Sequence, residues 1–353
     1  MHNILSKGDI VPNIETLTLT TEKYIAASRL DPLGLDTYFE QLPAINKAGD
    51  IDSLYEKLTE SVLKLDIEPT KTSYEALAVL RDLDFLASSY VRHGRNPIED
   101  VQGLEGHLVE LGGIVGTVPR GTVATYALAN PDNGRQRSFT GDSEESLFID
   151  AVRQTSLALE SSLEDFVRQD PTTALIQLDA NLDVAIQSIV SVMRALPPEY
   201  FTEEMRPYFD PLIIESKRYL GAGGAQLQFV AFDYILWGAN DPDTTYHSYF
   251  NENYSYLTPS QQSAIAEIMA KYDQHTLLEH IAMKDDKTAA LAAMDALKKM
   301  KKFRYPHRKL AQDNFKVRQQ GQVGSGSYTT DILDVLLFKT EQAIEVSEGI
   351  LNQ

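Results

Sequence analysis

Apolar residues recur at intervals of three and four along most of the chain, which is the spacing of one face of an α-helix. The clearest case is the stretch 73–92, whose apolar face consists of Leu77, Leu80, Leu83, Ala87, Tyr90 and Val91. It ends in Arg92, His93 and Gly94, a basic residue and a glycine at the positions that a helix C-terminus favours. No stretch alternates between apolar and polar residues over any length, so the pattern predicts an all-α protein.

Prolines, glycines and capping residues divide the rest of the pattern into further predicted helices. These helices are 20–27, 35–45, 51–65, 98–111, 142–166, 172–196, 198–207, 222–237, 259–272 and 285–303. Asp142 to Glu145 has the form of a capping box that opens the longest of them. The region 112–133 contains four glycines and two prolines, and we expect a loop or a short hairpin there.

One stretch near the C-terminus combines features that could build a pocket. Pro306 lacks an N–H and tends to start a helix, so we expect His307 in a first helical turn. About three turns of helix follow, then the glycine-rich loop 324–328 and a second long helix with the mostly apolar run 332–337. Helices on either side of a small-residue loop can form the walls of a pocket, and bare backbone N–H groups can receive an anion. A neutral imidazole facing such a pocket can be an axial ligand of haem iron.

Length and composition limit the remaining possibilities. At 353 residues the chain exceeds the usual size of one core, and we expect an N-terminal helical portion, 1–96, packed on a domain at 97–353, with one continuous domain as the alternative. The formal charge of -19 argues against nucleic acid and anionic membranes as partners. The absence of cysteine excludes disulfides, iron–sulfur clusters and thiolate-ligated haem. We expect neither a membrane span nor a signal peptide, and hence a cytoplasmic protein.

A group of basic residues stands out in this acidic chain. Its members are Lys298, Lys299, Lys301, Lys302, Arg304, Arg308 and Lys309. Two interpretations remain open. The group is either a solvated helix end whose cations suit the helix dipole, or a cationic rim that receives haem propionates or an acidic substrate.

Several stretches, in order from about Leu30 to the C-terminus, carry a resemblance to a known family. They are Leu83 to Gly94, ending in Arg-His-Gly; Arg137 to Gly141, reading Arg-Ser-Phe-Thr-Gly; Phe201 to Phe209; Tyr219 to Gly238; Phe303 to Ala311; and Gly324 to Tyr328. Together they resemble the indoleamine/tryptophan dioxygenase superfamily of haem proteins, and within it the branch that contains monodechloroaminopyrrolnitrin synthase. This resemblance implies a large helical bundle with a haem pocket between C-terminal helices.

The resemblance also implies roles for individual residues. His307 would be the axial ligand of a haem b, with Arg304, Gly223 and Gly224 beside the cofactor. Arg206 would hold the substrate carboxylate and act in catalysis together with Ser325. The other substrate-binding positions would be Phe201, Phe315, Gly324, Gly326 and Tyr328. At 315 the related enzyme has a tyrosine, so a hydroxyl that contacts substrate is missing here.

Plainer alternatives exist for the same residues. His93 is a rival haem ligand, although a histidine next to Gly94 is more often a helix cap. Arg206 could simply bridge Glu203 and Glu204, and the small residues at 223–224 could serve tight helix packing. The loop 324–326 could be a plain connection.

Three hypotheses about function follow. The first is a haem-dependent oxidoreductase that acts with dioxygen or peroxide on tryptophan or a related indole-bearing amine, by oxygenation or oxidative ring rearrangement. The second is a haem-binding or sensing protein without turnover, and the third is a helical interaction protein without a cofactor. Nothing in the sequence sets the oligomeric state.

Overall fold

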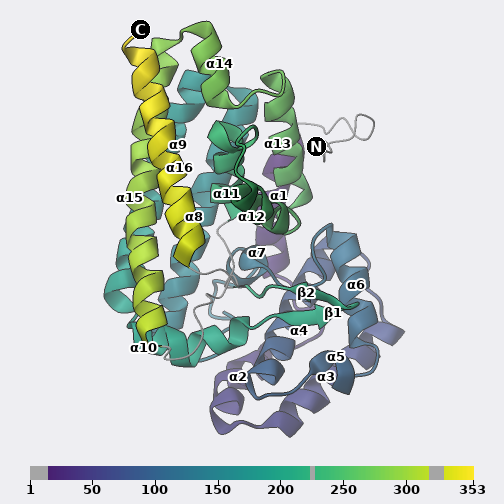
Figure 1. Ribbon diagram of the computed structural model, residues 1–353. Helices are drawn as coiled ribbons and strands as arrows, with labels where there is room; N and C mark the ends of the chain where they lie inside the picture. Colours follow the sequence, from purple (N-terminus) through teal and green to yellow (C-terminus); the bar gives the residue numbers. More distant parts are fainter. Residues whose placement is uncertain (1–14, 223–226, 318–329) are drawn as a thin grey trace.

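The computed structural model describes residues 15–222, 227–317 and 330–353, and most of this part is helical (Figure 1). The first helices are α1 (Glu15–Ser28), α2 (Asp36–Ala48), α3 (Ile51–Ile67), α4 (Ser73–Arg92), α5 (Pro97–Asp100), α6 (Leu104–Val115) and α7 (Val123–Ala127). The middle of the chain forms α8 (Ser143–Arg168), α9 (Pro171–Ala195), α10 (Pro198–Tyr200), the π-helix η1 (Phe201–Met205) and the 3-10 helix η2 (Arg206–Phe209). The last helices are α11 (Leu227–Asp233), the π-helix η3 (Tyr234–Gly238), α12 (Thr244–Tyr254), α13 (Pro259–Lys271), α14 (Leu277–Lys284), α15 (Lys287–Val317) and α16 (Thr330–Leu351). The prediction of an all-α fold is confirmed.

Four long helices, α8, α9, α15 and α16, stand side by side and form the tall part of the molecule (Figure 1). They associate because each carries a stripe of buried apolar side chains, such as Leu159 and Leu163 on α8 and Leu178 on α9. The buried face of α15 is mostly alanine, with Ala289, Ala293 and Ala296 fully covered. Small side chains let the neighbouring helices approach closely, so α15 is held rigidly along its first half.

Helix α9 is long and apolar enough, by length and composition, to cross a membrane. The core helix of a bundle passes the same test, and α9 packs against both α8 and α15. Two of its carboxylates, Asp179 and Asp183, bind Nζ of Lys299 on α15 at 2.8 Å and 2.7 Å. These contacts are those of a bundle helix and favour the expectation that the chain has no membrane span.

A second lobe contains α2 to α7 and a two-stranded antiparallel hairpin, β1 (Leu212–Ile214) and β2 (Lys217–Tyr219) (Figure 1). The hairpin was not predicted; it lies well beyond the region 112–133, where the structure has the short helix α7. Leu54, Leu83, Leu104 and Leu212 share one core, which therefore contains residues from both sides of the seam expected near 97. The division at 96/97 stays a prediction.

One predicted helix and one predicted capping box are wrong for identifiable reasons. The stretch 98–111 is broken into α5 and α6 because Gly103 adopts a positive φ of 90° at the start of α6. The side chain of Asp142 makes no capping bond, and Glu145 is fully buried beneath the preceding loop. The carboxylate of Glu145 accepts hydrogen bonds from the backbone N–H of Phe139 and Thr140, at 3.0 Å and 2.8 Å, and so organises that loop instead of a capping box.

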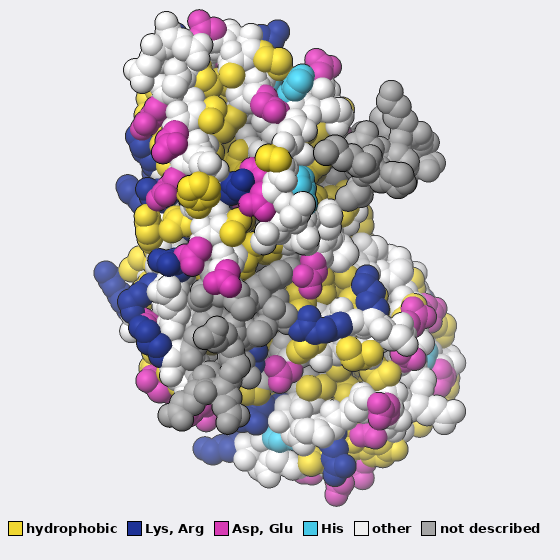
Figure 2. Space-filling view, viewed as in Figure 1, with side chains coloured by type: hydrophobic (Ala, Val, Ile, Leu, Met, Phe, Trp, Pro, Cys, Tyr) yellow, Lys and Arg dark blue, Asp and Glu magenta, His cyan; other side chains and the backbone are white. Residues whose placement is uncertain are grey.

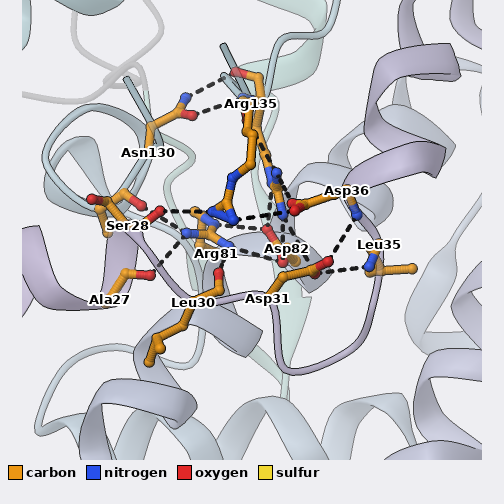
Figure 3. A network of polar contacts seen from close by, with 12 residues as sticks. Ala27, Ser28, Leu30, Asp31, Leu35, Asp36, Arg81, Asp82, Asn130 and Arg135 are labelled. Carbon is orange, nitrogen blue, oxygen red and sulfur yellow. Dashed lines mark hydrogen bonds and ion pairs between the residues drawn. The ribbon is translucent and has the colours of Figure 1, made fainter. Parts of the chain in front are cut away.

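A buried ionic network joins the α1–α2 loop, α4 and the segment before α8 (Figure 3). The carboxylate of Asp82 receives Nε of Arg81 at 2.7 Å and Nε of Arg137 at 3.2 Å, and all three side chains are fully buried. Arg137 also donates to Asp36 at 2.6 Å. Burial by itself would raise the pKa of Asp82, but the two guanidinium groups lower it below the usual value.

Candidate functional site

His307 lies inside α15, not at its start. The helix runs without interruption from Lys287 to Val317, so the expectation that Pro306 begins a new helix is wrong. Because proline has no N–H, the carbonyl of Lys302 lacks its usual partner one turn before the histidine. The helix continues despite the missing hydrogen bond because α15 packs along α9 and α16. The low helix propensity of proline alone would not predict this.

Aromatic rings lie beside the imidazole. Phe303, one turn earlier on α15, has its ring centroid 5.8 Å from that of His307. Phe229 of α11 stacks on Phe303 at 4.3 Å with an interplanar angle of 19°. These two rings bring α11 against α15 just before His307 and give the imidazole an apolar neighbour.

The imidazole is held in its neutral form. Burial, followed by the positive charge of Arg304, lowers the pKa of His307 from 6.5 to about 4. The residue is only partly buried. Its ring forms no hydrogen bond with any residue that the structure describes, that is, 15–222, 227–317 and 330–353. A neutral imidazole with a free nitrogen is the form that ligates a metal ion.

Arg304 is a buried connector and not a part of the surface. Its guanidinium binds the carboxylate of Asp233, the last residue of α11. It also donates to two groups on α16, the backbone carbonyl of Leu336 at 2.9 Å and the hydroxyl of Thr340. Only 7% of the residue is exposed. Arg304 therefore ties α11, α15 and α16 together directly behind His307, and its predicted contact with the cofactor stays a prediction.

The other basic residues of α15 are largely neutralised. Lys301 binds Glu341 at 2.9 Å, and Arg308 binds Asp334, both across to α16. Figure 2 shows Lys and Arg side chains along the edge where Figure 1 places α15, with carboxylates among them. Because the helix continues to Val317, Lys298 to Lys302 lie in its middle, so the explanation by the helix dipole is wrong for them.

The far end of the same helical face reaches η1. Residues 303, 307, 310 and 314 share one side of α15, since seven residues make almost two full turns. Leu310 packs against the first core together with Phe148 of α8 and Phe201 of η1. The Thr202 hydroxyl donates to the backbone carbonyl of Asn314 at 3.4 Å. His307 thus lies between the contact of α15 with α11 and its contact with η1.

Phe201 and Arg206 lie on this second contact. Phe201 packs on Phe148 and Phe209, with ring centroids 5.9 Å and 6.5 Å apart. Nη1 of Arg206 lies 3.3 Å from Oδ1 of Asp210, one turn further on, and the two side chains form an ion pair.

The remaining candidates divide into two groups. His93 ends α4, and burial followed by the nearby Arg92 lowers its pKa. It is therefore a helix-end histidine on a different element from His307. The other candidates lie outside the described residues; they are Gly223, Gly224, Gly324, Ser325, Gly326, Tyr328 and the side chain of Phe315.

Sequence reasoning missed two residues of the site. Asp233, which holds Arg304, lies in a helix far away in sequence, so no local pattern could have identified it. Asn314 was identifiable, because its spacing of seven from His307 places it on the same face.

The described side chains suit a cofactor whose metal is already held by an organic ring better than a metal ion bound by side chains alone. No three His, Asp or Glu residues in this part of the chain come together as metal ligands. Haem needs only an axial ligand from the protein. The imidazole of His307 fits that requirement, because it is neutral, lies beside the ring of Phe303 and forms no hydrogen bond with a described residue.

One comparison with known proteins bears on this arrangement. The family model described as monodechloroaminopyrrolnitrin synthase PrnB matches residues 36–346, which include α15 and nearly the whole described chain.

Proposed function

The chain belongs to the monodechloroaminopyrrolnitrin synthase PrnB family, an enzyme family, and on that premise we propose that it is a haem-dependent oxidoreductase. Its proposed substrate is tryptophan or a related indole-bearing amine. The reaction is oxygenation or oxidative ring rearrangement, in the chemistry of pyrrolnitrin biosynthesis. The single observation that carries the haem assignment is the neutral imidazole of His307, whose pKa is lowered to about 4 and whose ring forms no hydrogen bond with a described residue.

The bound haem would supply iron chemistry that activates dioxygen or peroxide. The residues of the chain then have the task of binding and orientation. His307 would hold the iron, and Arg304 acts behind it as a positioning residue that keeps α11 and α16 in place and keeps the imidazole unprotonated.

Substrate binding is assigned to the contact between α15 and η1. Phe201, Phe148 and Leu310 offer partly exposed apolar surface, which suits an indole ring. Arg206 offers a guanidinium, the group best suited to a carboxylate. Its partner Asp210 is almost half exposed, so a substrate carboxylate can replace that ion pair at little cost.

The test of the haem assignment is a pair of histidine variants. We expect His307→Ala to lose stoichiometric haem binding, measured by the Soret band and the pyridine haemochromogen assay after reconstitution. His93→Ala is the matched control and should bind one haem per chain. Normal haem content in His307→Ala, or a wild type that binds none, would overturn the assignment.

A further inference from the structure

Asn314 has one of the buried side-chain polar atoms that find no hydrogen-bond partner among the described residues. Its side-chain oxygen Oδ1 is buried and accepts no hydrogen bond within the described part of the chain. A buried acceptor without a donor costs about 1–3 kcal/mol, so native proteins rarely leave one. Such an atom at a candidate binding site points to a donor that arrives with the ligand.

The position of Asn314 is fixed from two sides. It lies on the His307 face of α15, two turns or about 10 Å further along the helix. Its backbone carbonyl accepts the hydrogen bond from Thr202, so the residue faces η1. The amide is therefore held at a set distance from the imidazole.

Apolar side chains lie on the elements that meet at Asn314. Leu310 on the preceding turn, Phe201 next to Thr202 and Phe148 across from it are each only partly buried. An apolar wall with one unpaired acceptor complements a flat aromatic ring that carries one N–H donor. Indole has that combination of features, and a plain benzene ring does not.

We propose that the side-chain oxygen of Asn314 accepts a hydrogen bond from the ring N–H of the indole substrate. This inference rests on the proposed function, and it names an atom that favours indole over rings without a donor. A binding site built around a hydrogen bond rejects analogues that lack the donor, because its own polar group then stays buried and unpaired.

The test compares two ligands that differ only at the ring N–H. L-Tryptophan and 3-(3-benzothienyl)alanine, in which sulfur replaces the N–H, are titrated into the protein as purified, by isothermal titration calorimetry. We expect the wild type to favour tryptophan about tenfold, the equivalent of one buried hydrogen bond. In Asn314→Leu the two ligands should bind equally, mainly through weaker binding of tryptophan.

Two further variants serve as controls. Asn314→Asp keeps an acceptor oxygen and should keep the preference, and so should Thr202→Val, which removes only the hydroxyl that binds the backbone of Asn314. If Asn314→Leu does not fold, as judged by circular dichroism, Asn314→Ala replaces it. A preference that survives in the Leu or Ala variant, or a wild type with no preference, overturns the proposal.

The outcomes separate this inference from the proposed function. Equal binding of both ligands by the wild type refutes the role of Asn314 and leaves an indole-binding enzyme in place. Binding of neither ligand refutes both. A preference for tryptophan in a protein that binds no haem supports Asn314 and refutes the cofactor.

Discussion

Arg206 is the residue whose proposed role can be separated from a structural one by comparing two ligands. Its ion pair with Asp210, at 3.3 Å, lies within one stretch of chain. A ligand that lacks the carboxylate therefore serves as the internal control for any structural effect of a variant.

We expect Arg206→Leu to weaken the binding of tryptophan by about 10-fold to 100-fold, because a charge-assisted hydrogen bond to the carboxylate is lost. Tryptamine, which lacks the carboxylate, should bind as in the wild type. The measurement is a titration of both ligands into wild type and variant. Equal losses for the two ligands would show that Arg206 supports the fold of η2 and not the carboxylate.

At the level of helices, α13 provides a clear case of local sequence deciding structure. The Thr258 hydroxyl accepts the N–H of Gln261, and Oε1 of Gln261 accepts the N–H of Thr258, which makes a complete capping box. Nε2 of Gln261 then donates to the buried carboxylate of Glu160 on α8 at 2.7 Å. The cap therefore also supports a contact between α13 and α8.

We expect Thr258→Ala to lower the free energy of unfolding by about 1–2 kcal/mol, through loss of the cap and loosening of Gln261. Thr258→Ser keeps the hydroxyl and should recover most of this loss. Urea denaturation followed by circular dichroism measures both. A Ser variant as unstable as the Ala variant would point to the lost methyl group as the cause.

Helices with a strong apolar period were predictable from sequence, and tertiary context decided the others. α4 has the predicted bounds, Ser73 to Arg92, because its apolar face and its end signal agree. Pro306 gave a false start signal, since packing along α15 outweighs one missing hydrogen bond. α12 was missed because tyrosines such as Tyr246, fully buried here, provide much of its inner face.

The same limit applies to the site. His307 was singled out by a family resemblance, and its role as a haem ligand stays a prediction. The residue that positions its helix, Asp233, could not, because the bond between Asp233 and Arg304 spans 71 positions in sequence and depends on the fold. Arg304 was expected at a surface rim, and its burial shows that a basic cluster in sequence is not a cationic patch in space.

At the scale of the whole molecule, we expect stability to be most sensitive to changes in the ionic network around Asp82. Asp82 is shared by two fully buried guanidinium groups, of which that of Arg137 also binds Asp36. Removal of one partner leaves buried charge uncompensated, which is costly whether or not the intact network is itself stabilising.

We expect Asp82→Asn to lower the free energy of unfolding by about 3–5 kcal/mol. Asp183→Asn, which breaks an ion pair of a more exposed carboxylate with Lys299, should cost about 1 kcal/mol or less. Chemical denaturation of both variants provides the comparison. Equal effects would mean that water reaches the network.

The same carboxylate makes a prediction about pH. Because the folded-state pKa of Asp82 is lowered from 3.8, its contribution is fully present above 3.8 and is lost as the pH falls through the lowered value. The free energy of unfolding of the wild type should therefore fall as the pH drops below 3.8, in part because Asp82 takes up a proton. Asp82→Asn should show a smaller fall over the same pH range.

Arg304 has a consequence for any redesign of this protein. Burial lowers the pKa of His307 most, and the Arg304 guanidinium adds to this effect while it also fastens the last helix, α16, to the rest of the bundle. A substitution of Arg304 therefore changes the proton affinity of the imidazole and the cohesion of the helices together. A redesign that aims at the imidazole alone must instead work through Phe303, whose uncharged ring lies beside that of His307.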